Sequence, residues 1–308
     1  MGAVAFLFAG QGAQYPGMGQ SLSESSKAAQ TVFALADQIR PGTSAQCFTG
    51  TKEELSQTVN TQPTVFAVDL AAACALLEAG IVPQAICGFS LGEVAALTFA
   101  GAFSHEGGFR LVTKRAELMQ RAAEQNKGGM AAVLKLANED VEQLCVSHPG
   151  VYLVNYNCPG QLVVAGVQDA LQEFCMAVQQ KGGRTMPLAV NGAFHSPYMA
   201  EAAEEFYQLL SDFSFQTPSY PVYANATAEP YAPPYETLLA KQIASPVRFE
   251  QSIRAMAQAG IDTFVEVGPG KTLTGLVKKI LSEANAYNVQ DAESLHATVR
   301  ALQGGNAC

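Results

Sequence analysis

Hydrophobic residues occur along this chain in two patterns, short continuous runs and longer stretches with helical spacing. A continuous apolar run of strand length predicts a strand that is buried on both faces, as in a parallel sheet. Such runs cover residues 3–9, 83–87, 221–226 and 263–267. We therefore expect an α/β fold whose sheet is parallel and is covered by helices.

Helices are predicted between and after these runs. Thr51 and Glu54 form a capping box that opens a short helix, and Pro41-Gly42 ends the helix before it. Gln62-Pro63 begins a long helix, rich in Ala and Leu, that extends to Gly80. The longer predicted helices span residues 23–39, 62–80, 104–125, 197–210, 235–243, 249–259 and 272–283.

The middle of the chain has a different rhythm. Strand-like segments at residues 130–136, 151–157, 161–167 and 184–190 alternate with helical segments at 138–148 and 169–181. The order βαββαβ is that of a ferredoxin-like module. We therefore predict a small subdomain at residues 128–191, inserted into a larger one made of residues 1–127 and 192–308.

Composition narrows the functional classes. The 308 residues are 48% hydrophobic and 15% charged, with a formal net charge of −9, so there is no basic stripe to bind nucleic acid or an anionic membrane. Seven cysteines without a Cys-x-x-Cys pair argue against a disulfide framework and a structural zinc site. The N-terminus lacks a basic region and no apolar run reaches about twenty residues. We expect a cytoplasmic monomer without a metal.

The segment Gly88-Phe-Ser-Leu-Gly92 joins a predicted strand to a predicted helix. Glycines on both sides let strand and helix approach closely, so the hydroxyl of Ser90 would project at the edge of the sheet as a nucleophile. The N–H of Leu91, in the first turn of the helix, would then stabilise an oxyanion. The alternative interpretation is an ordinary turn between a strand and a helix.

A glycine-rich loop, Gly10 to Gly19, follows the first predicted strand. Its spacing is not the Gly-x-Gly-x-x-Gly of dinucleotide sites, so we do not predict such a cofactor. The N–H of Gln11 is a candidate second oxyanion donor, the alternative being a plain connection. Gly268-Pro-Gly-Lys-Thr272 lacks the spacing of a phosphate-binding loop and is interpreted as a turn.

His195 precedes a helix that is capped by Ser196 and Pro197. The positive end of the helix dipole disfavours the imidazolium, which favours a neutral base, although a histidine near a cap is more often structural. Gln242 lies on an apolar helix face, where its amide could orient that histidine as a carboxylate does in a triad.

Arg115 is the one cation on the apolar face of the helix predicted at residues 104–125. A buried guanidinium must be paired, because an unpaired buried charge is very costly. Its partner is either an internal Asp or Glu or the carboxylate of a substrate bound by two hydrogen bonds.

Taken together, these segments resemble the malonyl-CoA:acyl carrier protein transacylase family. The resemblance covers nearly the whole chain in order, and it is carried by six segments: Gly10-Gln-Gly-Ala-Gln14, Gly88-Phe-Ser-Leu-Gly-Glu93, Arg115, Gly192-Ala-Phe-His-Ser196, Gln242 with Ser245-Pro-Val247, and Glu266-Val-Gly-Pro-Gly270. It implies a hydrolase-like large subdomain with the active site between it and the ferredoxin-like insert. Phe89 departs from the family, which usually has His before the nucleophile.

The resemblance also implies roles for single residues. Ser90 would accept the acyl group and His195 would be its base, with Gln11 and Leu91 as the oxyanion hole. Arg115 would bind the malonyl carboxylate and Gln242 would line the pocket. Ala193-Phe-His195 is typical of relatives that select malonyl groups.

The function expected from the resemblance is a ping-pong transfer of malonyl from malonyl-CoA, through malonyl-serine, to the phosphopantetheine thiol of an acyl carrier protein in fatty acid biosynthesis. Malonyl-CoA is then a substrate and no cofactor is expected. The alternatives are a trans-acting acyltransferase of polyketide synthesis, a serine thioesterase or hydrolase, and a non-catalytic docking module. Lys278-Lys279 and Lys181 with Arg184 are candidate contacts for an acidic carrier.

Overall fold

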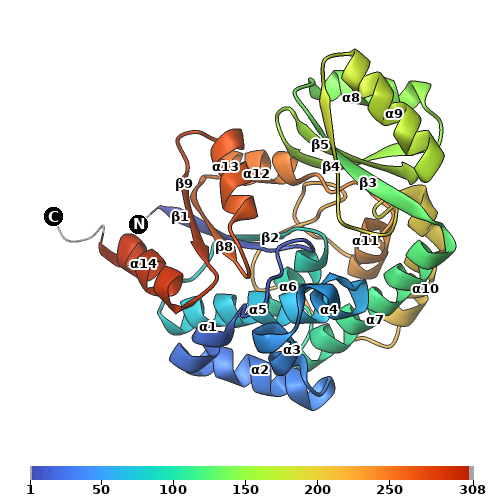
Figure 1. The fold of residues 1–308 in the computed structure, drawn as a ribbon. Coiled ribbons are helices and arrows are strands. Elements are labelled where there is room, and N and C mark those ends of the chain that lie inside the picture. Colours follow the sequence, from blue (N-terminus) through green and yellow to red (C-terminus); the bar gives the residue numbers. More distant parts are fainter. Residues whose placement is uncertain (1, 305–308) are drawn as a thin grey trace.

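The computed structural model describes residues 2–304, and its larger part is built on a five-stranded sheet (Figure 1). The strand order is β7-β2-β1-β8-β9, and all neighbours are parallel. The strands are β1 (Ala3–Phe8), β2 (Ala85–Gly88), β7 (Val222–Tyr223), β8 (Ile261–Val267) and β9 (Asn285–Val289). The parallel sheet predicted from the four apolar runs is confirmed.

Side chains of the central strand β1 alternate between two hydrophobic cores, because successive residues of a strand point to opposite faces. Val4, Phe6 and Phe8 pack with the apolar faces of α2, α5, α6 and α7. Ala5 and Leu7 pack with α12 and α13 on the other face. Both faces are therefore buried, which explains the continuous apolar run.

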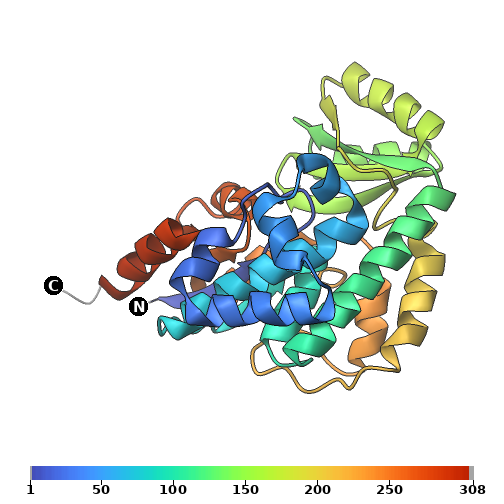
Figure 2. The ribbon, with the colours of Figure 1, turned by 60° about the horizontal axis from the view of Figure 1, so that its bottom comes forward.

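The helices before the small sheet are α1 (Gln20–Ser25), α2 (Lys27–Ile39), α3 (Thr43–Thr49), α4 (Lys52–Ser56), α5 (Thr58–Glu78), α6 (Leu91–Phe99) and α7 (His105–Gln125). In Figure 2 the blue to green helices of this group gather on one side of the sheet. The later helices are α10 (Ala200–Leu210), which follows the short turn Pro197–Met199, then α11 (Tyr235–Gln242), α12 (Phe249–Gln258), α13 (Thr272–Ile280) and α14 (Ala292–Gln303).

The middle of the chain forms a second, antiparallel sheet of order β4-β5-β3-β6. Its elements are β3 (Gly128–Leu134), α8 (Asn138–Ser147), β4 (Val151–Cys158), β5 (Gln161–Val167), α9 (Gln168–Gln180) and β6 (Arg184–Pro187). This order and topology confirm the predicted ferredoxin-like arrangement.

The two faces of the small sheet pack against different hydrophobic cores. Ala131 and Val133 of β3 pack under its own helices, whereas Met130 and Ala132 belong to the core of the larger part. The two parts therefore share a packed boundary. The exact division of the chain at residues 128 and 191 stays a prediction.

Two predicted helices differ from the structure. The helix predicted at residues 23–39 is broken at Ser26, whose Oγ accepts a hydrogen bond from Ala29 N at 3.1 Å and so caps α2. The long helix begins at Thr58, so Pro63 lies inside α5 and not near its first position. The missing N–H of Pro63 removes one hydrogen bond near the helix start, which the extensive burial of α5 offsets.

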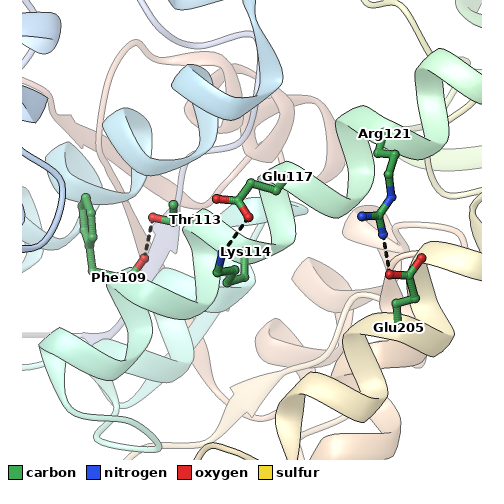
Figure 3. A network of polar contacts seen from close by, with 6 residues as sticks. All are labelled: Phe109, Thr113, Lys114, Glu117, Arg121 and Glu205. Atoms are coloured by element: carbon green, nitrogen blue, oxygen red, sulfur yellow. Dashed lines mark hydrogen bonds and ion pairs between the residues drawn. The ribbon is translucent and has the colours of Figure 1, made fainter.

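Helix α7 has the two faces that were predicted. Ser104 caps its N-terminus, and the exposed stripe carries an ion pair between Lys114 and Glu117 at 2.8 Å (Figure 3). Arg121 reaches across to Glu205 of α10. The opposite face is buried and includes Arg115.

Three further observations concern residues 2–304. No helix in this range is long and apolar enough to cross a membrane. The cysteines at positions 47, 74, 87, 145, 158 and 175 are free thiols, and Cys308 lies outside the described residues. No group of three His, Cys, Asp or Glu side chains in this range is placed to hold a metal ion.

Candidate active site

Ser90 lies at the apex of the turn between β2 and α6. Its φ of 56° and ψ of −107° are strained for a residue with a side chain. A Cβ on Gly88 would lie 2.0 Å from the main-chain carbon of Gly92, and one on Gly92 would lie 2.4 Å from the carbonyl oxygen of Phe8. Only glycine fits at either position, so the predicted strand, tight turn and helix are confirmed.

The hydroxyl of Ser90 faces His195, with Oγ and Nε2 2.7 Å apart. His195 also has a positive φ, 60°, and its Nδ1 lies 3.0 Å from the main-chain carbonyl oxygen of Gln242. Because a carbonyl only accepts, Nδ1 carries the proton and Nε2 is free to accept from the serine. Burial, followed by the nearby Arg115 cation, lowers the pKa of His195 to about 4. The imidazole is a neutral base at physiological pH.

Gln242 acts differently from the prediction. Its main-chain carbonyl orients His195, whereas its side-chain amide faces elsewhere. Oε1 accepts from Arg115 Nη2 at 2.8 Å, and Nε2 donates to the carbonyl oxygen of Ser90 at 2.8 Å. The idea that this amide replaces a triad carboxylate is therefore wrong. A backbone carbonyl at the end of α11 already satisfies Nδ1.

Arg115 is fully buried, and all its hydrogen-bond partners are neutral. Nη1 donates to Gln62 Oε1 at 2.7 Å, while Nη2 donates to Gln242 Oε1 at 2.8 Å and contacts Ser90 Oγ at 3.3 Å. Nε has no partner among the described residues.

The predicted alternative of an internal Asp or Glu partner for Arg115 is not found. No carboxylate in residues 2–304 lies within ion-pair distance of its guanidinium. Burial lowers the pKa of Arg115 to about 10, which still leaves it charged at neutral pH. The guanidinium is thus a cation beside the serine whose neutral neighbours leave its charge uncompensated at contact distance.

A cavity of about 80 Å³ lies in front of the serine and is lined from both parts of the molecule. Ser90, His195 and Gln11 meet Asn155 of β4 there, together with Phe89, Met119, Met130, Leu188, Val190 and Phe194. A Cβ on Gly10 would lie 2.7 Å from the carbonyl oxygen of Phe89, so the first glycine loop does press against the serine turn, as expected.

The N–H groups of Gln11, which lines this cavity, and of Leu91, which directly follows Ser90, are the two predicted oxyanion donors. Among residues 2–304 neither donates to a protein acceptor. Phe89, the departure from the family pattern, lines the cavity wall and packs edge-on against Phe249 with ring centroids 5.5 Å apart.

A second cavity of about 240 Å³ shares Gln11, Phe89, Asn155 and Leu188 with the first. It runs between the small sheet and α13, and its walls mix apolar side chains with asparagines. The Oδ1 atoms of Asn155 and Asn157 are buried there without a protein partner. Because they share four lining residues, the two cavities adjoin each other in front of Ser90.

These groups are supported by four residues for which no role was predicted from the sequence: Gln62, Glu93, Asn225 and Tyr231. Asn225 Oδ1 accepts from Ser90 N at 2.8 Å, and Glu93 accepts from the main-chain N–H of Asn225 at 2.6 Å. A signal was available for Asn225, because it follows a strand neighbouring that of Ser90, and parallel strands end at one edge. Gln62 and Tyr231 have no comparable local signal.

Comparisons with known proteins agree with this site. The acyl transferase domain family matches residues 5–304. The malonyl CoA-acyl carrier protein transacylase of Bacillus subtilis (strain 168) is 37% identical over 314 residues, which covers 99% of each chain. The crystal structure of such a transacylase from Clostridium perfringens has a TM-score of 0.95 at 36% identity, covering 98% of each chain.

A third relative is the malonyl-transacylase of a complex described as "PlMCAT:AntF (holo)", in which it is bound to a type II polyketide synthase acyl-carrier protein. It has a TM-score of 0.93 at 32% identity and covers 97% of this chain and 99% of the other. From the family match and the similarity along its whole length, this chain belongs to the acyl transferase family, among the malonyl CoA-acyl carrier protein transacylases.

Proposed function

We propose that this protein transfers a malonyl group from malonyl-CoA to the phosphopantetheine thiol of an acyl carrier protein, through a malonyl ester on Ser90. The observation that carries the proposal is the 2.7 Å contact between Ser90 Oγ and His195 Nε2, next to the uncompensated cation of Arg115. The first arrangement makes a nucleophile, and the second selects a carboxylate.

In the first half-reaction His195 Nε2 takes the proton of Ser90 as Oγ attacks the thioester carbonyl of malonyl-CoA. The negative charge that develops on the carbonyl oxygen is stabilised by the N–H groups of Gln11 and Leu91. When the C–S bond breaks, the imidazolium returns its proton to the sulfur and CoA leaves as a thiol. Malonyl-Ser90 remains.

In the second half-reaction the carrier's thiol enters the same cavity and gives its proton to His195. The sulfur attacks the ester carbonyl, the C–O bond to Ser90 breaks, and Oγ regains the proton. A pantetheine arm carries amides, and the asparagines that line the larger cavity, Asn155 and Asn157, have side-chain amides that suit hydrogen bonds with them. A serine hydrolase, which would use water here, is the alternative enzyme.

Specificity for malonyl groups rests on Arg115. Its unpartnered Nε and the Nη2 near Ser90 can both serve a carboxylate that lies beyond the reacting carbonyl. Gln62 and Gln242 hold the guanidinium without neutralising it. An acetyl group would leave this cation without a counter-ion.

We place the reaction in fatty acid biosynthesis in the cytoplasm. The free thiols of the described cysteines suit a reducing compartment. The polyketide alternative differs only in the carrier, so parallel transfer rates to a fatty acid carrier and a polyketide carrier distinguish them. Lys279, whose Nζ donates to Gln161 at 3.1 Å beside the larger cavity, is the proposed contact for an acidic carrier.

Intact-protein mass spectrometry after mixing with malonyl-CoA tests the chemistry. The wild type should gain one malonyl group and lose it when carrier protein is added. Ser90→Ala should gain none, and His195→Ala should be acylated roughly 10²–10⁴-fold more slowly. Loss of the group without carrier would indicate a hydrolase, and acylation of Ser90→Ala at the wild-type rate would place the nucleophile elsewhere.

A further inference from the structure

The strained turn at Ser90 is held by side chains from other parts of the chain. A residue other than glycine in this conformation costs about 1–3 kcal/mol, so it persists only where its surroundings determine it. The carbonyl oxygen of Ser90 accepts from Gln242 Nε2, and its N–H donates to Asn225 Oδ1, each at 2.8 Å. Both main-chain polar groups of the nucleophile are therefore bonded to side chains.

Asn225 also bonds the strand side of the turn. Its Nδ2 donates to the carbonyl oxygen of Gly88 at 2.6 Å, so one amide bridges the residues on both sides of Phe89. Oδ1 receives a second, longer hydrogen bond of 3.2 Å from Gln242 Nε2. Two donors face Oδ1 and one carbonyl faces Nδ2, which fixes the orientation of the amide.

Asn225 is itself held firmly. It is fully buried, its main-chain carbonyl accepts from Arg248 N at 2.9 Å, and its N–H donates to Glu93 Oε2 at 2.6 Å. Glu93, in the first turn of α6, also accepts from the hydroxyl of Tyr231. The backbone of Asn225 is thus anchored to the helix that Ser90 begins.

We propose that Asn225, anchored by Glu93 and Tyr231, is a positioning residue that keeps Ser90 Oγ in line with His195. It bonds the backbone of the nucleophile's turn and lines neither of the two cavities in front of Ser90. Through Gln242 it also adjoins the carbonyl that orients His195 and the amide that holds Arg115. The inference rests on the proposed function for its main assay, but not for its second one.

Two substitutions separate positioning from the filling of space. Asn225→Ala removes all three side-chain hydrogen bonds, to Ser90, Gly88 and Gln242. Asn225→Asp keeps the volume and the acceptor for Ser90 N, but it places an oxygen against the carbonyl of Gly88 and a second carboxyl near Glu93. If volume alone mattered, Asn225→Asp would resemble the wild type.

The main assay is the rate of malonyl-Ser90 formation at saturating malonyl-CoA, with the half-saturating concentration measured separately. We expect the rate to fall roughly 10²-fold in Asn225→Ala, and at least as far in Asn225→Asp, because misplacement by about 1 Å costs that much. The half-saturating concentration should change less than about threefold, since the binding groups remain. Asn126→Ala is the matched control, because the Asn126 side chain also donates to main-chain carbonyls, those of Ala122 at 3.2 Å and Tyr198 at 2.9 Å, but it bonds neither Ser90 nor His195. It should keep the wild-type rate.

The second assay does not require malonyl-CoA to be the substrate. Labelling of Ser90 by a small fluorophosphonate, measured by mass spectrometry of the intact protein, should slow by a similar factor in both Asn225 variants. If the wild type is labelled but never malonylated, the proposed function is wrong. The labelling rates of the Asn225 variants still test whether Asn225 positions Ser90. Should Asn225→Ala not fold, Tyr231→Phe, which removes only the hydroxyl that holds Glu93, should still slow both reactions about fivefold. Wild-type rates in the folded variants would overturn the proposal.

Discussion

Arg115 is an unusual residue because its full charge is buried among neutral acceptors. Removing a guanidinium from water is costly, and two amide oxygens repay only part of that cost. The charge of Glu93 raises the pKa of Arg115, against the larger effect of burial, without forming an ion pair with it. A substrate carboxylate would complete the pairing.

We therefore predict a selective effect of substitutions at Arg115. Arg115→Ala should lower kcat/KM for malonyl-CoA by about 2–4 kcal/mol in transition-state free energy, while acetyl-CoA is used as well as before or better. Arg115→Lys should recover little, because a point charge does not reproduce the planar fork. The measurement is kcat/KM for both thioesters in each variant.

The control for this series is Arg121→Ala, because Arg121 lies on the exposed face of the same helix and pairs with Glu205 (Figure 3). It should leave both substrates unaffected. An unchanged ratio of malonyl to acetyl activity in the Arg115 variants would assign carboxylate selection to another residue.

His195 leads to a pH prediction. Its pKa of about 4, lowered first by burial and then by Arg115, lies below the ordinary value of 6.5. The acylation rate should therefore stay nearly constant from neutral pH down to about 5 and fall only as the imidazole protonates. Replacing Arg115 by Gln removes the cation, so the acid limb should move to higher pH when acetyl-CoA is the substrate.

The same shift has a consequence for stability. Because the folded-state pKa is the lower one, the neutral imidazole contributes stability that is present above the unfolded value of 6.5 and is lost as the pH falls through about 4. Circular dichroism at each pH separates this unfolding from the titration of the base. A wild-type acid limb near 6.5 would contradict the assignment.

Helix α5 carries a buried carboxyl group, Asp69, where the helix meets the end of β8. Asp69 is fully buried, and neither carboxyl oxygen has a protein partner within residues 2–304. It lies directly against Gly268, where an added Cβ would be 1.8 Å from Oδ1. Burial, and then the charge of Glu266, raises the pKa of Asp69 well above its usual value.

Asp69 should make the protein less stable in alkali. A raised folded-state pKa means that the neutral carboxyl contributes stability at low pH, and that this is lost as the pH rises through the folded value. The free energy of unfolding should be measured with urea at about pH 5 and about pH 9. Relative to the wild type, Asp69→Asn should be more stable at the higher pH than at the lower one. Asp262→Asn, at an exposed position near the start of β8, is the control. A pH-independent difference would contradict the prediction.

Most elements could be predicted because their patterns are local. The strand β1 has an unbroken apolar run, and α7 has Ser104 as a cap and one clear polar stripe. The elements β9 and α14 were missed, because β9 lies at the sheet edge with the mixed sequence Asn-Ala-Tyr-Asn-Val and only Val289 fully buried. An edge strand lacks the apolar run that marks its buried neighbours.

The site was predictable only where one segment determined the geometry. Ser90 follows from two glycines that allow a close turn, and His195 from its place before a capped helix. The partners of Arg115 come from α5 and α11, and Asn225 reaches Ser90 across 135 positions of sequence. Such contacts depend on tertiary packing, which no local pattern encodes.

The two reacting residues of this molecule both have backbone conformations that favour glycine, Ser90 with φ 56° and His195 with φ 60°. Alanine at position 90 retains the strain, whereas glycine relieves it. We predict that Ser90→Gly melts at a higher temperature than Ser90→Ala by the equivalent of roughly 1 kcal/mol, the reverse of their order at ordinary positions. Differential scanning calorimetry of both variants decides this, and a higher melting temperature for Ser90→Ala would refute it.

This strain bears on how the enzyme can be engineered. A mutant library selected only for survival of heating would accumulate glycine at position 90, because the better-folded variants there are inactive ones. Selection for thermostability should therefore be coupled at every round to a screen for acyl transfer, or hold position 90 constant.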